Sequence, residues 1–340
     1  MTVFEIFRAL RRTFFAGTVI CVVSMQTSGI AQAQEHKLTL MLPLTAIYAL
    51  PYFAAEDLGI FKEEGLAVEF KVVNGDQNAV RAMLSGSAEV ATGIGPPILF
   101  ELAGRGGKVK VIDSPMRVTD YFLIMGKGKG SALKDLAGKR VAISNPGSMP
   151  HLLPQMMLKK NGIDPANAGI SFVAIGGMSA RLQAIVADKV DASIVDTQAT
   201  LVGQKDITVI TSTAEQFPEG LAYGYSIVTE DALKNPKTRM ALVALGRSVI
   251  RASRAIMADP DRAALILHER FKKSVDLDLL KAVVRQLNAQ KVWNTGQGVE
   301  KSVYDFTLQS YLAANTIQKA VPYDVAVDPL IGAEALKSLR

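Results

Sequence analysis

Short apolar runs alternate with segments of helical periodicity between residues 35 and 125. Strands are predicted where apolar and β-branched residues run together, at 37–42, 67–73, 90–94 and 109–112. Helices are predicted where apolar residues recur every three or four positions, at 51–58, 77–84 and 98–103. Because strands that alternate with helices pair mostly in parallel, this region is predicted to form a sheet covered on both faces.

A glycine-dense connector, Gly126–Gly130, precedes a second region with the same rhythm. Its strands are predicted at 140–144, 170–175, 192–195, 207–210 and 223–228, and its helices at 149–160 and 179–187. After Asp231 helices dominate, at 236–258, 262–271, 277–288 and 299–314. The chain is therefore predicted to be an α/β protein whose strand-and-helix pattern occurs twice.

A short sequence pattern, which we call the internal echo, occurs once in each of the two regions. The helical segment 82–84 is followed by Glu89 and a buried strand, and the segment 184–186 is followed by Asp191 and a buried strand. Two lobes built on one plan would produce this echo.

The first residues have the order of an export signal. Arg8, Arg11 and Arg12 form a basic region, residues 14–23 an apolar one, and 31–33 read Ala-Gln-Ala, the small-x-small pattern of a cleavage site. Cleavage is predicted near residue 33, with residues 1–33 as the signal peptide. The apolar run is shorter than the roughly 20 residues that cross a bilayer. An amphipathic first helix is the alternative, and it does not account for the cleavage pattern.

Composition narrows the class of protein further. The 340 residues are 49% apolar and 21% charged, which disfavours a disordered chain. Without residues 1–33, 35 basic and 31 acidic side chains remain, so the formal charge falls from +6 to +4. No block of basic residues interleaved with aromatic ones occurs, so nucleic-acid binding has no positive support. The single cysteine, Cys21, lies in the predicted signal, so the mature chain has none for a disulfide.

Familiar catalytic and metal-binding patterns are absent from the sequence. His36, His151 and His268 are widely spaced, which argues against a zinc site. The glycines of 126–131 lack the third glycine of a dinucleotide loop, and Ser226 lacks the second glycine of a nucleophile elbow. We therefore predict no metal, no cofactor and no catalytic residue.

Loops that end strands and open helices are the stronger signal. Four of them occur, at 74–76, 93–97, 145–148 and 176–179. In open α/β sheets ligands bind at the carboxyl ends of strands, and helix N-termini present unpaired N–H groups to an anion. Ordinary helix capping explains any single loop. Four such loops across two regions favour a ligand-binding cleft.

Three segments carry a resemblance to a known family. Residues 54–69, with Gly59, Phe61 and Gly65, resemble a signature of the exported solute-binding proteins of ABC importers for nitrate, sulfonates, taurine and thiamine-pyrimidine precursors. Residues 133–142 are similar to the start of that family's second lobe. Residues 147–151 resemble its ligand-facing helix start.

The resemblance implies a type II periplasmic-binding fold, with two lobes joined by a two-strand hinge. Lobe one would hold residues 35–125 and 223–340, and lobe two residues 126–222. Two positions, Glu89 and Asp188, depart from the family pattern, and we expect them to shape turns rather than to bind ligand.

The strand-end loops and the resemblance together predict the residues that face the ligand. From lobe one these are Thr45, Tyr48, Asn74, Gly75, Gly93 and Ile94. From lobe two they are Asn145, Gly147, Ser148, His151, Gly176, Gly177, Met178, Asp196 and Thr197, with Tyr223 near the hinge. Their expected role is hydrogen bonding and shape complementarity.

Two of the candidates have a second interpretation. Arg117 follows the fourth predicted strand and would pair with a carboxylate or a sulfonate, although it also fits a surface arginine. His151 would donate to the ligand or pack within the first turns of its helix.

The principal functional hypothesis is a monomeric periplasmic protein that captures a small anionic or amphipathic organic solute. It would deliver the solute to an ABC permease with its ATPase, and it would meet the membrane only through that permease. An enzyme on the same fold that acts on a bound pyrimidine or menaquinone precursor is the competing hypothesis, and the predicted export signal weighs against it. A periplasmic sensor subunit is the third. Fold alone does not distinguish them.

Overall fold

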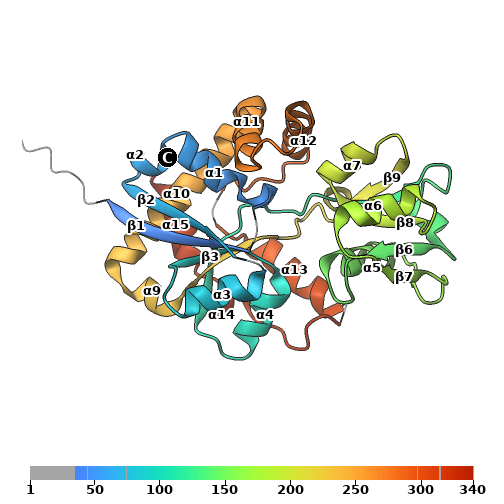
Figure 1. Ribbon diagram of the computed structural model, residues 1–340. Helices are drawn as coiled ribbons and strands as arrows, with labels where there is room; N and C mark the ends of the chain where they lie inside the picture. The colour runs from blue at the N-terminus through green and yellow to red at the C-terminus, as the bar shows by residue number, and fades with distance from the viewer. Residues whose placement is uncertain (1–34, 44, 74, 297, 314, 340) are drawn as a thin grey trace, which may run out of the picture. The chain divides into compact units, whose positions relative to one another are not determined.

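Two five-stranded sheets organise the part of the chain that the computed structural model describes, residues 35–43, 45–73, 75–296, 298–313 and 315–339 (Figure 1). The predicted signal peptide with Cys21, and Asn74, lie outside these residues. The first sheet has the order β2-β1-β3-β10-β4, built from Leu66–Val72, His36–Leu42, Val90–Ile94, Tyr225–Thr229 and Val109–Asp113. The second has the order β7-β6-β8-β5-β9, built from Ser171–Ala174, Arg140–Ile143, Ala192–Asp196, Tyr121–Gly126 and Ile207–Ser212.

Helices connect the strands within each sheet. Those of the first sheet are α1 (Leu50–Asp57), α2 (Ile60–Glu63), α3 (Asp76–Leu84) and α4 (Pro96–Gly104), with the 3₁₀ turn η2 (Ile47–Ala49) after β1. Those of the second are α5 (Met149–Lys160), α6 (Met178–Val186), α7 (Thr197–Gly203) and α8 (Thr213–Gln216), with the 3₁₀ turn η3 (Leu133–Leu136) before β6.

The rest of the chain after β10 is helical, as predicted. It forms α9 (Glu230–Lys234), α10 (Pro236–Ala258), α11 (Pro260–Arg270), α12 (Leu277–Ala289), α13 (Lys301–Ala313), α14 (Tyr323–Ala326) and α15 (Pro329–Lys337). Asp259 caps α11 by accepting a hydrogen bond from the Arg262 amide at 3.0 Å, so this helix begins at Pro260, two residues before its predicted start. No helix among the described residues is long and apolar enough to span a membrane.

The prediction of mostly parallel sheets is confirmed, because four of the five strands in each sheet run in the same direction. β1 pairs in parallel with β2 and β3, and β6 pairs in parallel with β7 and β8. However, β10 is antiparallel to both β3 and β4, and β5 is antiparallel to both β8 and β9. These two strands enter their sheets as the chain passes from one sheet to the other, without the helical crossover that places a strand parallel to its neighbour.

The same crossing changes the lobe to which one segment belongs. Residues 121–125 were predicted to belong to lobe one, but β5 forms its hydrogen bonds with β8 and β9 of the second sheet. The chain therefore passes between the sheets through two segments, 114–120 and 213–224. Within them Met116 bridges Tyr223, and Val118 bridges Leu221.

The two sheets share one plan, as the internal echo predicted. In both, the strand that follows an acidic residue lies beside the first strand of its lobe. Glu89 accepts a hydrogen bond from the Thr39 amide in β1 at 2.7 Å, and Asp191 accepts one from the Arg140 amide in β6 at 2.9 Å. We call each sheet with its flanking helices a lobe from here on.

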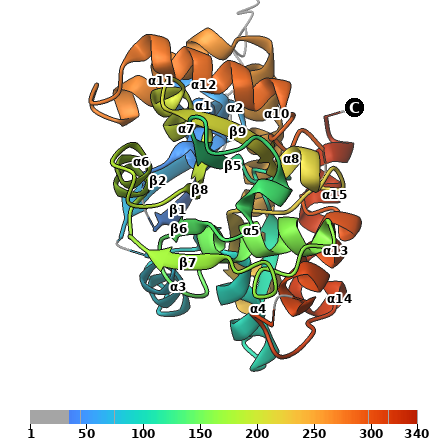
Figure 2. The same cartoon turned by 90° about the vertical axis from the view of Figure 1, so that its right-hand side faces the viewer.

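Two of the C-terminal helices reach the second lobe (Figure 2). Helix α12 contacts α7, and α13 meets α5 where the Tyr311 hydroxyl contacts the Met149 sulfur. Helix α10 packs against α1 and α15 on the first lobe. The lobes are thus in contact through helices as well as through the two crossing segments.

Candidate ligand-binding site

A cavity of about 320 Å³ lies where the carboxyl ends of β1 and β8 meet the crossing segments. Its size suits a small organic molecule. It is lined by Thr45, Ala46, Ile47, Tyr48, Met116, Asp120, Tyr121, Met178, Asp196, Gln198, Tyr223 and Phe271. These residues come from both lobes, as expected for a site at the strand ends of an open α/β sheet.

Tyrosine rings form the wall on the side of the first lobe. Tyr48, in η2, is buried, and its ring meets the ring of Tyr223 edge to face, with centroids 6.4 Å apart and an interplanar angle of 83°. Gly93, with φ of +81°, packs against Tyr48 so closely that a Cβ at this position would lie 2.3 Å from the Tyr48 ring. Gly93 thus supports the wall without lining the cavity.

Two carboxylates face the cavity from the other side. Asp196 ends β8 and caps α7, where it accepts a hydrogen bond from the Ala199 amide at 2.7 Å. Asp120 precedes β5 and accepts one from the Thr197 amide at 3.4 Å. Burial, and then the negative charge of Asp196, raise the pKa of Asp120 to about 7. Burial likewise raises the pKa of Asp196.

A third carboxylate, that of Asp76, acts electrostatically on the Tyr223 hydroxyl. Burial raises the pKa of Tyr223, and the charges of Asp76, Asp120 and Asp196 raise it further. Asp76 opens α3 in the first lobe and accepts a hydrogen bond from the Gly95 amide at 2.8 Å. Negative charge therefore reaches the cavity from both lobes and from one crossing segment.

A buried arginine lies behind the second-lobe wall. The guanidinium of Arg181, in α6, is hydrogen-bonded to the Ser193 hydroxyl and to the carbonyl oxygens of Ile194 and Gly176. Burial lowers its pKa, while its charge acts on Tyr121 and Asp196. Arg181 is not among the residues that line the cavity.

Five predicted residues line the cavity together: Thr45, Tyr48, Met178, Asp196 and Tyr223. The sequence analysis missed seven others, namely Ala46, Ile47, Met116, Asp120, Tyr121, Gln198 and Phe271. Asp120 and Tyr121 stand at the start of β5, and the available signal was a polar residue next to an aromatic one before the apolar run 122–125. Phe271 follows α11, far along the chain, and no local pattern indicated it.

The predicted residues at the start of α5 bind one another. The Gly147 amide donates to Nδ1 of His151 at 2.9 Å, and the Ser148 hydroxyl donates to the Asn145 carbonyl oxygen at 2.6 Å. The His151 ring also packs edge-on against Phe172, with centroids 5.0 Å apart. None of these four predicted residues lines the cavity.

The remaining predicted residues lie around the cavity rather than on its wall. Arg117 donates to the Glu219 carbonyl oxygen at 3.4 Å and borders a separate, much smaller pocket. The Thr197 hydroxyl donates to the Asp120 carbonyl oxygen at 3.4 Å, and the Gly176 carbonyl oxygen accepts from Arg181. Three others stand in the core or at helix starts, namely Ile94, Gly75 and Gly177.

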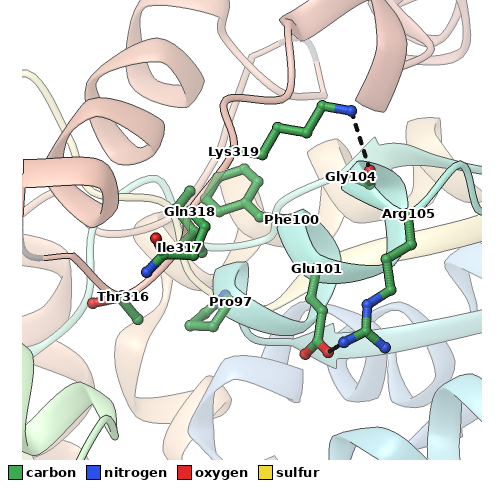
Figure 3. Close-up of a pocket in the computed structure, with 9 residues that line it drawn as sticks. All are labelled: Pro97, Phe100, Glu101, Gly104, Arg105, Thr316, Ile317, Gln318 and Lys319. Atoms are coloured by element: carbon green, nitrogen blue, oxygen red, sulfur yellow. Dashed lines mark hydrogen bonds and ion pairs between the residues drawn. The ribbon is translucent and has the colours of Figure 1, made fainter.

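A second cavity, of about 340 Å³, lies between α4 and the segment 316–319 (Figure 3). Glu101 and Arg105 form an ion pair at 2.8 Å on its rim, and Lys319 reaches the Gly104 carbonyl oxygen at 3.5 Å. All of its lining residues belong to the first lobe. The cavity between the lobes is the better candidate because two strand ends converge on it.

A family model described as NMT1/THI5 like matches residues 46–263. The chain belongs to the NMT1/THI5-like family. The predicted family is therefore confirmed, and the match includes β10 and most of both lobes.

Solved structures confirm the predicted periplasmic-binding fold of this NMT1/THI5-like chain. The periplasmic aliphatic sulphonate binding protein SsuA from Escherichia coli is 15% identical, with a TM-score of 0.69 over 86% of this chain and 92% of that one. The ligand-binding component of an ABC-type import system from Staphylococcus aureus, with zinc bound, is 14% identical, with a TM-score of 0.67 over 88% of this chain and 99% of that one. Among the described residues of the present chain, no group of three His, Cys, Asp or Glu side chains is placed to hold such an ion.

A curated relative matches over a shorter stretch. "Putative binding protein YtlA" of Bacillus subtilis (strain 168) is 28% identical over 123 residues. The match covers 35% of this chain and 36% of YtlA, so the chain spans about a third of the length of that relative.

Proposed function

We propose that this chain is the solute-binding component of an ABC import system. It captures a small organic solute in the cavity between its lobes and delivers it to a permease with its ATPase. The observation that carries the proposal is that both lobes and both crossing segments contribute side chains to one cavity. Membership of the family and the binding roles named for SsuA and the Staphylococcus aureus protein support it.

The proposal includes the location and state of the protein. Residues 1–33 direct export to the periplasm, cleavage occurs near Ala33, and the mature protein works as a monomer. The solute leaves chemically unchanged, so the protein is not an enzyme.

The proposal also includes a closing motion. Lobe one comprises residues 35–120 and 223–340 and lobe two residues 121–222, because β5 pairs with β8 and β9 of the second sheet. The paired backbones at Met116 and Tyr223 act as the hinge, and both residues also line the cavity. A ligand that contacts both lobes therefore favours the closed state by its differential affinity.

A thermal-shift screen of the full chain tests the binding role. The panel contains sulfonates, nitrate, carboxylates, pyrimidines and amines. Binding to the native state stabilises it by mass action, by about 2.7 kcal/mol at a ligand concentration 100 times Kd. We expect at least one class to raise the melting temperature, and the radius of gyration measured by small-angle scattering to fall with it.

Variants connect the binding to the cavity. Tyr223→Ala should weaken the best ligand by about tenfold or more, as expected for a buried aromatic contact. Tyr323→Ala removes a tyrosine from α14, away from the cavity, and should keep the affinity. Recovery of a chemically altered ligand would overturn the carrier role in favour of an enzyme.

A further inference from the structure

We propose that the solute is a small organic cation, such as a protonated amine, whose charge lies between Asp120 and Asp196 while its apolar part rests on the tyrosine rings. The inference rests on the proposed solute-binding function and names its ligand class. It departs from the anionic or amphipathic solute that the sequence analysis expected.

The charge of the cavity wall is the first argument. Asp120 and Asp196 are the charged side chains among its described lining residues, and none of those residues is Lys, Arg or His. Asp76 adds a third negative charge that acts on Tyr223. Arg181 offsets one of them, and its guanidinium is already hydrogen-bonded to Ser193, Ile194 and Gly176. A buried anion would meet uncompensated like charge here, which is strongly unfavourable.

The helix N-termini give the second argument, because an anion would need their free N–H groups. At the start of α5 the Gly147 amide donates to His151. At the starts of α4 and α7 the donors are used by carboxylates, Gly95 by Asp76 and Ala199 by Asp196. At each of these three helix starts an amide that an anion could use is bonded within the protein, and two of the three acceptors are carboxylates.

The aromatic walls give the third argument. Tyr48, Tyr121, Tyr223 and Phe271 all line the cavity. The faces of such rings attract cations, by about 0.5 to 2 kcal/mol for each well-placed ring. The ring of Tyr223 and the two lining carboxylates thus both favour a positively charged ligand.

The pKa values of the carboxylates agree with this assignment. The pKa of Asp120 is raised to about 7 by burial and by Asp196. Tyr121, Tyr223 and Arg181 are the other titratable groups that act on this pair. A bound cation favours the ionised carboxylates, so its affinity should increase as the pH rises from about 6 to about 8.

Matched probes that differ only in the charge of one end test the proposal. Phenethylamine, phenethyl alcohol and phenethyl sulfonate form one trio, and butylamine, butanol and butyl sulfonate form a second. Each is titrated calorimetrically into the full chain at about pH 8, where Asp120 is mostly ionised. We expect the amine of at least one trio to bind and its alcohol and sulfonate to bind about tenfold or more weakly.

Isosteric variants assign the effect to the two carboxylates. Asp120→Asn and Asp196→Asn should each weaken the amine about tenfold or more. Asn also caps helices, so Asp196→Asn keeps the start of α7. Asp206→Asn removes the same charge from an exposed position before β9 and should leave the affinity unchanged.

The outcomes separate the two proposals. Tighter binding of a sulfonate than of its amine would overturn the cationic assignment and leave solute binding in place. Equal loss of amine affinity in Asp206→Asn would assign the effect to net charge rather than to the site, and would also overturn it. Failure of both trios together with every class of the wider panel would overturn the solute-binding function itself.

Discussion

The ring of Tyr48 occupies the space that a side chain at Gly93 would need. A Cβ built on Gly93 would lie 2.3 to 2.4 Å from two ring carbons and the hydroxyl oxygen of Tyr48, and the φ of Gly93 is +81°. Tyr48 in turn meets Tyr223 edge to face. A residue without a side chain therefore positions the aromatic wall of the cavity.

Gly93→Ala should displace the Tyr48 ring and weaken solute binding. Gly86→Ala is a matched control because Gly86 has a similar φ of +78° and no atom within 4 Å of an added Cβ. Both changes impose left-handed alanine, at about 1 to 2 kcal/mol. Gly93→Ala adds overpacking of about 1 to 3 kcal/mol. Urea denaturation measures the difference, and equal unfolding free energies for the two variants would contradict the steric account.

Asp120→Asn should change how the stability of the empty protein depends on pH. The pKa of Asp120 is raised in the folded state to about 7, whereas an unfolded aspartate titrates near 3.9. Between these values the folded state binds more protons, so the unfolding free energy falls as pH rises, by up to about 1.4 kcal/mol per pH unit. Asp120→Asn should make this slope shallower, as measured by denaturation at several pH values from about 4 to 8. A slope identical to that of the wild type would show that Asp120 does not titrate there.

Asp191→Asn should destabilise the second lobe at neutral pH, because the pKa of Asp191 is lowered whereas that of Asp120 is raised. Hydrogen bonds from Arg140, and then the bond from Lys129, lower the pKa of Asp191. Its stabilisation is therefore present above the unfolded pKa of about 3.9 and disappears as pH falls through the folded value.

The expected loss in Asp191→Asn is about 2 kcal/mol at pH 7, from hydrogen bonds to a charged group. The difference from the wild type should shrink as the pH is lowered below about 4. Asp206→Asn, at an exposed position, serves as the control and should show no such difference. A difference that is constant with pH would mean that the charge of Asp191 is not what stabilises the lobe.

Tyr52→Phe should destabilise the first lobe without changing the affinity for the solute. The Tyr52 hydroxyl donates to Asp113 at 3.2 Å, lies 2.5 Å from the Ser226 hydroxyl and accepts from Thr92 at 3.1 Å, all in the buried core. Loss of this hydroxyl removes one hydrogen-bond donor from the buried Asp113, at a cost of about 1 to 3 kcal/mol. Thermal unfolding measures the cost, and calorimetric affinity for the best ligand should stay unchanged because Tyr52 does not line the cavity. A large loss of affinity would instead tie this network to the site.

Local pattern was enough to predict the principal elements. The helices at 149–160 and 236–258 and the strand at 90–94 have the predicted bounds. These elements follow from side-chain periodicity over a few residues, which the backbone geometry of helices and strands imposes. The repeated pattern around Glu89 and Asp191 was also visible in the sequence, although the hydrogen bonds that these acids accept join residues 50 and 51 positions apart.

Local sequence pattern did not predict the short helices or the direction of two strands. Helices α7, α14 and α15 have seven, four and nine residues, and none was predicted. Helices this short gain most of their stability from packing against the rest of the protein. The antiparallel placement of β5 and β10 depends on where the chain crosses between lobes, which no window of sequence contains.

The amino-acid sequence by itself determined that this is a two-lobed α/β chain of the NMT1/THI5-like family, with loops at strand ends where a ligand would bind. Only the tertiary structure decided which of those loops face the cavity and what charge they present. Asp120, Asp196 and Phe271 come together from segments 75 or more residues apart. The physical reason is that secondary structure follows from neighbouring residues, whereas burial and electrostatic coupling depend on every element packed around a site.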